Sequence, residues 1–216
     1  MSAHNLKSVA GILIPDSTIA TQATELLREH GNDFLYNHSL RVFLFASLNG
    51  KRSNAVYDPE LLYVSAAFHD LGLVPHYSSP DKRFEVDGAN AARDFLKGHG
   101  LPKESLQLVW DTIALHTTIG IAEYKEPEVA LMYSGVGLDV MGEGYEHLSA
   151  ENREEIIGLF PRTDFKKKII PTFFDGFKHK TGTTFGNIKA DVCTFMIPGF
   201  KSKNFCDCIL HSAWSE

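Results

Sequence analysis

Apolar residues recur at spacings of three and four along most of this 216-residue chain, and that period constrains its fold more than any other feature. Such spacing places side chains on one face of an α-helix, whereas a half-buried strand needs strict alternation. Capping signals frame these stretches: Ser17 precedes TIATQATELLREH, which Gly31 follows, and Asp58-Pro59-Glu60 opens a later helix. Convincing period-2 strands are absent. The sequence therefore predicts an all-α helical bundle.

The expected helices follow one another without a repeat, a low-complexity tract or a long linker, which predicts a single domain over residues 1–216. Its core is expected at about 30–145, with a helical extension at about 146–216. Pro171 is expected to kink or end the helix that contains it. The helices are expected at about 18–30, from 33 to 48 with an end before Asn49-Gly50, from 59, and at about 85–98, 103–117, 127–141, 149–158 and 163–178, with one or two short ones after 184.

Charge and composition exclude several classes of partner. The net charge is −6 and the sequence pI is about 5.9, which argues against binding to nucleic acid or to an anionic membrane, because phosphate neutralisation needs clustered Lys and Arg. Three cysteines are too few and too clustered for a disulfide framework, and no window approaches a membrane span. We therefore expect a cytoplasmic protein. The apolar stretch TFMIPGF at 194–200 is a candidate contact within a homo-oligomer.

Four of the apolar stripes also carry ionisable residues. His38 lies with Leu35, Val42 and Phe45; His69 lies with Leu62 and Ala66 and is followed by Asp70; His116 lies with Leu106, Val109 and Ile113; Asp139 lies with Val129, Met132 and Val136. A lone inward histidine is often a satisfied core residue, but a buried carboxylate is costly unless it is paired. One divalent cation would compensate His38, His69, Asp70 and Asp139 together. Imidazole nitrogen and carboxylate oxygen suit Zn²⁺, with iron and manganese as alternatives.

These residues also carry a family resemblance. His38 in NHSLRVF, His69-Asp70 in FHDLG and Asp139 in GVGLDVMG follow the order of the HD-domain metal hydrolases. The longer segments YNHSLRVFLFA, RFEVDGANAARDFL, ALHTTIGIA and GLDVMG resemble the cyanamide hydratase branch, in order from 35 to about 191. The resemblance implies an HD-type bundle with one zinc ion. It also implies a hydro-lyase of detoxification that adds water to the nitrile of cyanamide, giving urea.

Two departures from the wider superfamily fit this branch. Phosphohydrolase members often carry a lysine shortly after the His-Asp pair, where this chain has Leu71-Gly72-Leu73-Val74. Dinuclear members usually place a histidine where this chain has Phe84, four residues before Gly88, which favours a single metal ion. A phosphohydrolase acting on a small phosphomonoester or nucleotide is the alternative, and Arg41 is its best support. A helical module that keeps a metal only for stability is a third interpretation.

The expected chemistry begins with water on the metal, whose pKa can fall to about 7, so that metal-bound hydroxide attacks the nitrile carbon. Asp70 would accept the proton of this water. His116 would donate a proton to the nitrile nitrogen, with a role as a substrate contact or a metal ligand left open. Thr117, or Thr118, would orient the small-molecule substrate, unless the hydroxyl only bonds the backbone at a helix end.

The approaches to the site predict a small, mostly neutral substrate. Large side chains lie within a few residues of the stripes, although any one of them is also explained as aromatic core: Phe34, Phe43, Phe68, Tyr77, Phe84 and Trp110. Glu85 and Asp87 are close to an expected helix start, where carboxylates are favoured electrostatically. We expect them to cap that helix, and the alternative is that one of them faces the site.

Overall fold

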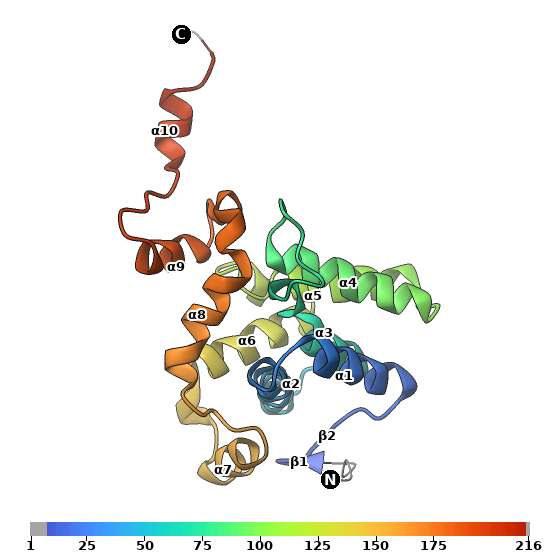
Figure 1. The fold of residues 1–216 in the computed structure, drawn as a ribbon. Helices are drawn as coiled ribbons and strands as arrows, with labels where there is room; N and C mark the ends of the chain where they lie inside the picture. Colours follow the sequence, from blue (N-terminus) through green and yellow to red (C-terminus); the bar gives the residue numbers. More distant parts are fainter. Residues whose placement is uncertain (1–7, 215–216) are drawn as a thin grey trace.

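Helix α2 (Asp33–Ser53) lies within the body of the molecule and packs against several other helices there (Figure 1). The computed structural model describes residues 8–214. Within them the fold is helical apart from a short hairpin of two two-residue strands, β1 (Ser8–Val9) and β2 (Ile12–Leu13). The all-α prediction is confirmed. The remaining α-helices are α1 (Thr18–His30), α3 (Pro59–Phe68), α4 (Phe84–Gly98), α5 (Lys103–Ala114), α6 (Pro127–Met141), α7 (Ala150–Leu159), α8 (Phe165–Phe177), α9 (Lys189–Met196) and α10 (Phe205–Leu210). Short 3-10 helices are η1 (Leu71–Leu73), η2 (Ala122–Tyr124), η3 (Tyr145–His147) and η4 (Lys178–Thr184).

The predicted capping residues begin their helices as expected. The Ser17 side chain accepts a hydrogen bond from the backbone N–H of Ala20 at 3.1 Å. Asp58 does the same for α3, accepting from the N–H groups of Glu60 and Leu61 at 2.9 and 3.1 Å. A capped first turn satisfies backbone donors that would otherwise lack a partner, which is why these residue types mark helix starts.

Three helix ends differ from the prediction. Helix α2 continues past Asn49-Gly50 to Ser53, and Gly50 inside it packs so closely that an added Cβ would lie 2.8 Å from the Tyr57 ring. Pro171 lies inside α8 and does not end it, since the turns on both sides are anchored by the buried Ile169 and Phe177. Helix α5 ends at Ala114 rather than near 117, so His116 and Thr117 lie in the turn that follows.

Close packing of α2 against α6 brings distant residues together. An added Cβ on Gly135 of α6 would lie 2.6 Å from the carbonyl oxygen of Val42 on α2. Only glycine allows two helix backbones to approach so closely. The contact fixes α6, one turn before Asp139, against the helix that carries His38.

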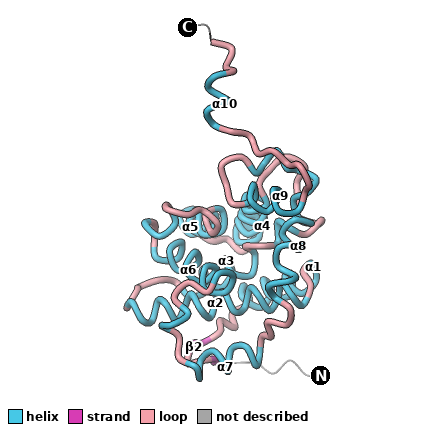
Figure 2. The backbone as a smooth tube through the Cα atoms, turned by 90° about the vertical axis from the view of Figure 1, so that its left-hand side faces the viewer, coloured by secondary structure: helices cyan, strands magenta, loops and turns pink. Residues whose placement is uncertain are grey.

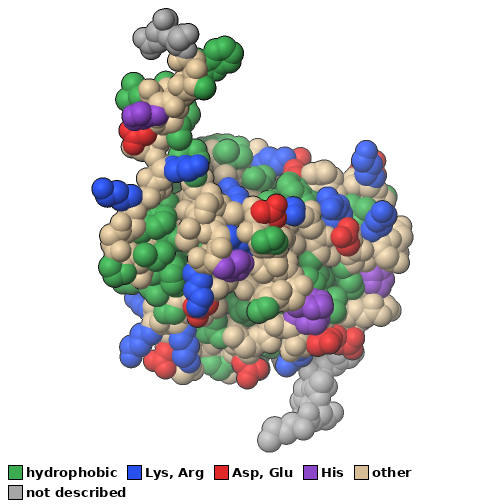
Figure 3. All heavy atoms as spheres, turned by 45° about the horizontal axis from the view of Figure 1, so that its top comes forward, with side chains coloured by type: hydrophobic (Ala, Val, Ile, Leu, Met, Phe, Trp, Pro, Cys, Tyr) green, Lys and Arg blue, Asp and Glu red, His purple; other side chains and the backbone are tan. Residues whose placement is uncertain are grey.

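The C-terminal part packs on the body through a small apolar cluster. Leu73 and Phe84 from the body meet Phe177 and Cys193 from α8 and α9. Helix α10 then stands away from the body (Figures 1 and 2). On the face shown in Figure 3, basic side chains are scattered among acidic and apolar ones. No helix between residues 8 and 214 has the length and apolarity to cross a membrane.

Candidate metal centre

Three of the predicted ligands meet in the core. His38 projects from the first half of α2, His69 is the residue at which α3 ends, and Asp70 follows directly. Two glycines let α4 press against the His-Asp turn: an added Cβ on Gly72 would overlap the carbonyl group of Phe84, and one on Gly88 would lie 2.8 Å from the carbonyl oxygen of Phe68. The turn is therefore held against α4 by close backbone packing.

The side chains of these residues converge to within metal-binding distance of one another. The two Nε2 atoms of His38 and His69 are 3.2 Å apart. Asp70 Oδ2 lies 3.5 Å from the first and 3.3 Å from the second. All three side chains are almost fully buried, and their ligand atoms form one group spanning no more than 4.8 Å. An ion between them would draw on two imidazoles and one carboxylate.

Hydrogen bonds on the far side of each imidazole assign its tautomer. Nδ1 of His69 is 2.8 Å from the carbonyl oxygen of Ala66, and Nδ1 of His38 is 2.6 Å from Asp139 Oδ2. Because these oxygens accept only, each Nδ1 carries a hydrogen, and in the neutral form of each ring Nε2 presents a lone pair to the cluster. Lone pairs that face one another at 3.2 Å repel, unless a positive charge lies between them. This second-sphere bonding is the pattern of metal-ligating histidines.

The charge of the cluster also favours a bound cation. Both oxygens of Asp70 are buried without a hydrogen-bond partner among the described residues. Burial alone would raise the pKa of Asp70, but the neighbouring His69 and His38 hold it well below its usual range, so the carboxylate is ionised. Burial alone would lower the pKa of His69, yet the charge of Asp70 outweighs burial and raises it. The space between these groups thus attracts positive charge, and the donor set fits a divalent metal ion.

Asp139 is placed behind His38 rather than in the cluster. Its carboxylate accepts from His38 Nδ1 and from Arg41, whose Nε and Nη2 lie 2.8 and 2.9 Å from the two oxygens. Arg162 donates to the same carboxylate. The two guanidinium groups hold these oxygens on the far side of the imidazole, where Asp139 orients His38. Direct binding of the ion by Asp139 stays a prediction.

His116 lies one step outside the three-residue group. Its Nε2 is 3.8 Å from Asp70 Oδ1 and has no other partner within the described chain, while Nδ1 is 2.6 Å from the carbonyl oxygen of Ile113. Burial lowers the pKa of His116 to about 4. The imidazole is therefore neutral at pH 7, with an unprotonated Nε2 facing Asp70. A neutral imidazole with that lone pair available accepts a proton before it can donate one, and the predicted donation to the nitrile nitrogen stays a prediction.

Thr117 is bonded to a side chain rather than to the backbone. Its hydroxyl donates to Glu85 Oε1 at 2.7 Å and is buried. Glu85 was expected to cap α4, but that helix has no side-chain cap at its start. Glu85 instead accepts from Lys189 at 2.6 Å and from Arg83 at 2.9 Å. These cations outweigh burial and lower the pKa of Glu85 to about 2, so it is ionised.

Only part of the predicted aromatic surroundings lies at the site. The Phe84 ring is 5.6 Å from the ring of His116, and the Phe165 ring is 5.6 Å from that of His38. Phe43 and Phe68 belong to the hydrophobic core instead, and Trp110 donates to Asn90. The sequence patterns missed Phe165 and Lys189, whose helices look like ordinary amphipathic ones, and Arg162, which lies in the loop between α7 and α8.

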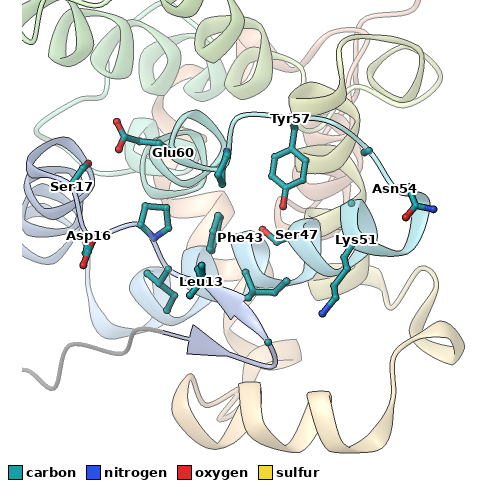
Figure 4. Close-up of a pocket in the computed structure, with 16 residues that line it drawn as sticks. Leu13, Asp16, Ser17, Phe43, Ser47, Lys51, Asn54, Tyr57 and Glu60 are labelled. Carbon is teal, nitrogen blue, oxygen red and sulfur yellow. The ribbon is translucent and has the colours of Figure 1, made fainter.

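A separate cavity of about 990 Å³ lies between the hairpin, the end of α2 and the start of α3 (Figure 4). Its lining includes Leu13, Phe43, Lys51 and Tyr57 but none of the predicted site residues. The cavity is therefore distinct from the metal centre.

Fold and site together define a helical protein with a buried site for a divalent metal. Comparison with known families agrees: the model of the HD domain matches residues 35–156, more than half of the chain, and the chain belongs to this family. HD domains bind a divalent metal, and the family indicates a metal-dependent hydrolase. The match contains all four predicted ligands but ends before Arg162, Lys180 and Lys189. A search of curated proteins found no match.

Proposed function

We propose that this protein is a zinc-dependent hydratase that adds water to the nitrile of cyanamide and releases urea. The proposal rests on the likeness of its sequence segments to the cyanamide hydratase branch and on one structural observation. The cations near the cluster are already bonded to protein carboxylates, so a small neutral substrate fits better than a phosphate ester.

Arg41 carries this argument, because it was the best support for a phosphohydrolase. Its guanidinium is fully buried and holds Asp139 in a two-point contact, and its Nη1 donates to the carbonyl oxygens of Phe160 and Pro161 at 3.1 and 2.9 Å. Arg162 is bonded to the same carboxylate, and Lys189 to Glu85. Binding a phosphate dianion in this core would require breaking one of these pairs.

His38, His69 and Asp70 would hold the ion. A divalent ion there would lower the pKa of water and so make its oxygen a better nucleophile near neutral pH. His116 Nε2, beside Asp70, accepts the proton that water loses as its oxygen bonds to the nitrile carbon. The same proton then passes to the nitrile nitrogen as the C≡N π bond breaks, giving isourea, which tautomerises to urea. Asp70 stays ionised and balances the positive charge on His116 during the transfer.

The direct test is to incubate the purified full-length protein with cyanamide and measure urea, with and without a chelator. The same preparation is offered a phosphomonoester as the competing substrate class. The proposal predicts urea formation that the chelator stops and that His69→Ala abolishes. Phosphate release without urea, or urea formation that persists in His69→Ala, would contradict it.

A further inference from the structure

A buried chain of three polar residues reaches the site from outside the matched HD region. Lys189, at the start of α9, donates to Glu85 Oε1, and the same oxygen accepts from Thr117, next to His116. Lys189 and Glu85 are both fully buried. The Lys189 ammonium also lies 5.1 Å above the Phe84 ring, which packs edge-on against His116. The C-terminal extension thus contributes a side chain to the surroundings of the centre.

The bonding of Glu85 decides what Thr117 can offer. Glu85 Oε1 receives hydrogen bonds from Lys189, Arg83 and Thr117, and an ionised carboxylate has no hydrogen to give back. The single hydrogen of the Thr117 hydroxyl must therefore point at Glu85. What remains on Oγ1 is lone pairs, so this oxygen can only accept.

Thr117 also borders an open space. A crevice of about 320 Å³ is lined by Arg83, Thr117 and Thr118 on one side and by residues 186–188 and Asp191 of the C-terminal extension on the other. A substrate of a few atoms would fit readily there. Thr117 thus lines the crevice, and its neighbour in the chain is His116, whose Nε2 faces Asp70.

We infer that Lys189 and Glu85 are positioning residues that fix Thr117 as an acceptor, and that the site therefore selects nitriles carrying an N–H donor. This inference rests on the proposed function. Cyanamide carries an amino group that can donate to Thr117 Oγ1. Acetonitrile has a methyl group of nearly the same size in that position, and a methyl group cannot donate. Sites built around a polar group discriminate strongly against analogues that lack its partner.

The test compares the KM for cyanamide with the inhibition constant of acetonitrile. The wild-type protein should bind acetonitrile at least about tenfold more weakly, and Thr117→Val should shrink that ratio about tenfold, through KM rather than kcat. Dissociation constants from the visible spectrum of cobalt-substituted protein give the same ratio without turnover. Lys189→Met should change the ratio in the same direction, because the Thr117 hydroxyl then loses its fixed orientation.

Lys180→Met is the matched control. Lys180 is likewise buried and bonds a carboxylate of α4, Asp87, at 2.7 Å, but this pair contacts Ser78 and Ser79 rather than Thr117. The control should keep the wild-type ratio at unchanged metal content. If Lys189→Met fails to fold, Thr117→Val decides alone.

An unchanged ratio in Thr117→Val with metal bound, or an equal change in Lys180→Met, would overturn the inference. A wild-type protein that makes no urea would contradict the proposed function instead. In that case the cobalt spectrum still tests selection for the N–H donor.

Discussion

Two buried carboxylates flank the metal centre, and the same arrangement of charges serves a different end at each. Asp139 is held by Arg41 and Arg162 and accepts from the imidazole of His38, a member of the metal-binding group. Glu85 is held by Arg83 and Lys189 and accepts from the hydroxyl of Thr117. One carboxylate therefore fixes a ligand, and the other fixes a group beside the proposed substrate.

The comparison also shows what the C-terminal extension contributes. At each carboxylate one cation comes from the segment that follows the matched HD region: Arg162 at Asp139, and Lys189 at Glu85. Removing one member of a buried pair leaves an uncompensated charge, which is far more costly than losing a surface pair. The extension is thus tied to the site by charge as well as by apolar packing.

The largest contrast is expected between Asp139→Asn and Glu85→Gln. Each change leaves a buried cation without its partner and should destabilise the fold by about 3–5 kcal/mol. Asp139→Asn should also weaken metal binding by about 10–100-fold, because the hydrogen bond that orients His38 is weakened. Glu85→Gln should leave metal affinity unchanged. Chemical denaturation and metal titration measure the two quantities, and equal loss of metal affinity in both variants would erase the distinction between them.

A smaller contrast separates the two arginines at Asp139. Arg41 is fully buried and makes four hydrogen bonds, whereas a quarter of the Arg162 side chain is exposed. Arg41→Ala should therefore cost about 3–5 kcal/mol of stability. Arg162→Ala should cost about 1–3 kcal/mol, since water can partly replace its contacts. Chemical denaturation of both variants measures the loss of stability, provided that the slope of free energy against denaturant is the same. A larger loss in Arg162→Ala than in Arg41→Ala would contradict the prediction.

The sequence predicted the metal-binding group better than either carboxylate cluster. The spacing of apolar residues along a helix reveals its buried face, and this spacing predicted that His38 and His69 point inward. Asp70 was predicted because it follows His69 directly. Glu85 and Lys189 are 104 positions apart and lie near helix starts, where charged residues are common on the surface. Their pairing depends on how α9 docks on α4, and no local pattern encodes that docking. The same holds for Asp139, whose stripe predicted burial but not the two arginines that hold it behind His38.

The smallest expected effect concerns acid stability. The pKa of Glu85 falls from its ordinary 4.5 to about 2 in the folded protein, so its contribution to stability is present above about 4.5 and is lost as the pH drops towards 2. Glu85→Gln should remove this part of the acid dependence, while the parts due to Asp70 and Asp139 persist. Unfolding of metal-free protein between pH 5 and about 2 measures the difference. If the free energy of unfolding fell equally with pH in the wild type and in Glu85→Gln, the ion pairing of Glu85 would be contradicted.

The most direct test of the account is the metal content per chain of the wild type and of His69→Ala, measured by elemental analysis. His147→Ala is the matched control, because His147 lies in η3 with its side chain more than half exposed. The account predicts about one divalent ion per chain in the wild type and in the control, and none in His69→Ala. A wild type that binds no metal under saturating conditions, or a His69→Ala protein that keeps its ion, would contradict the central claim.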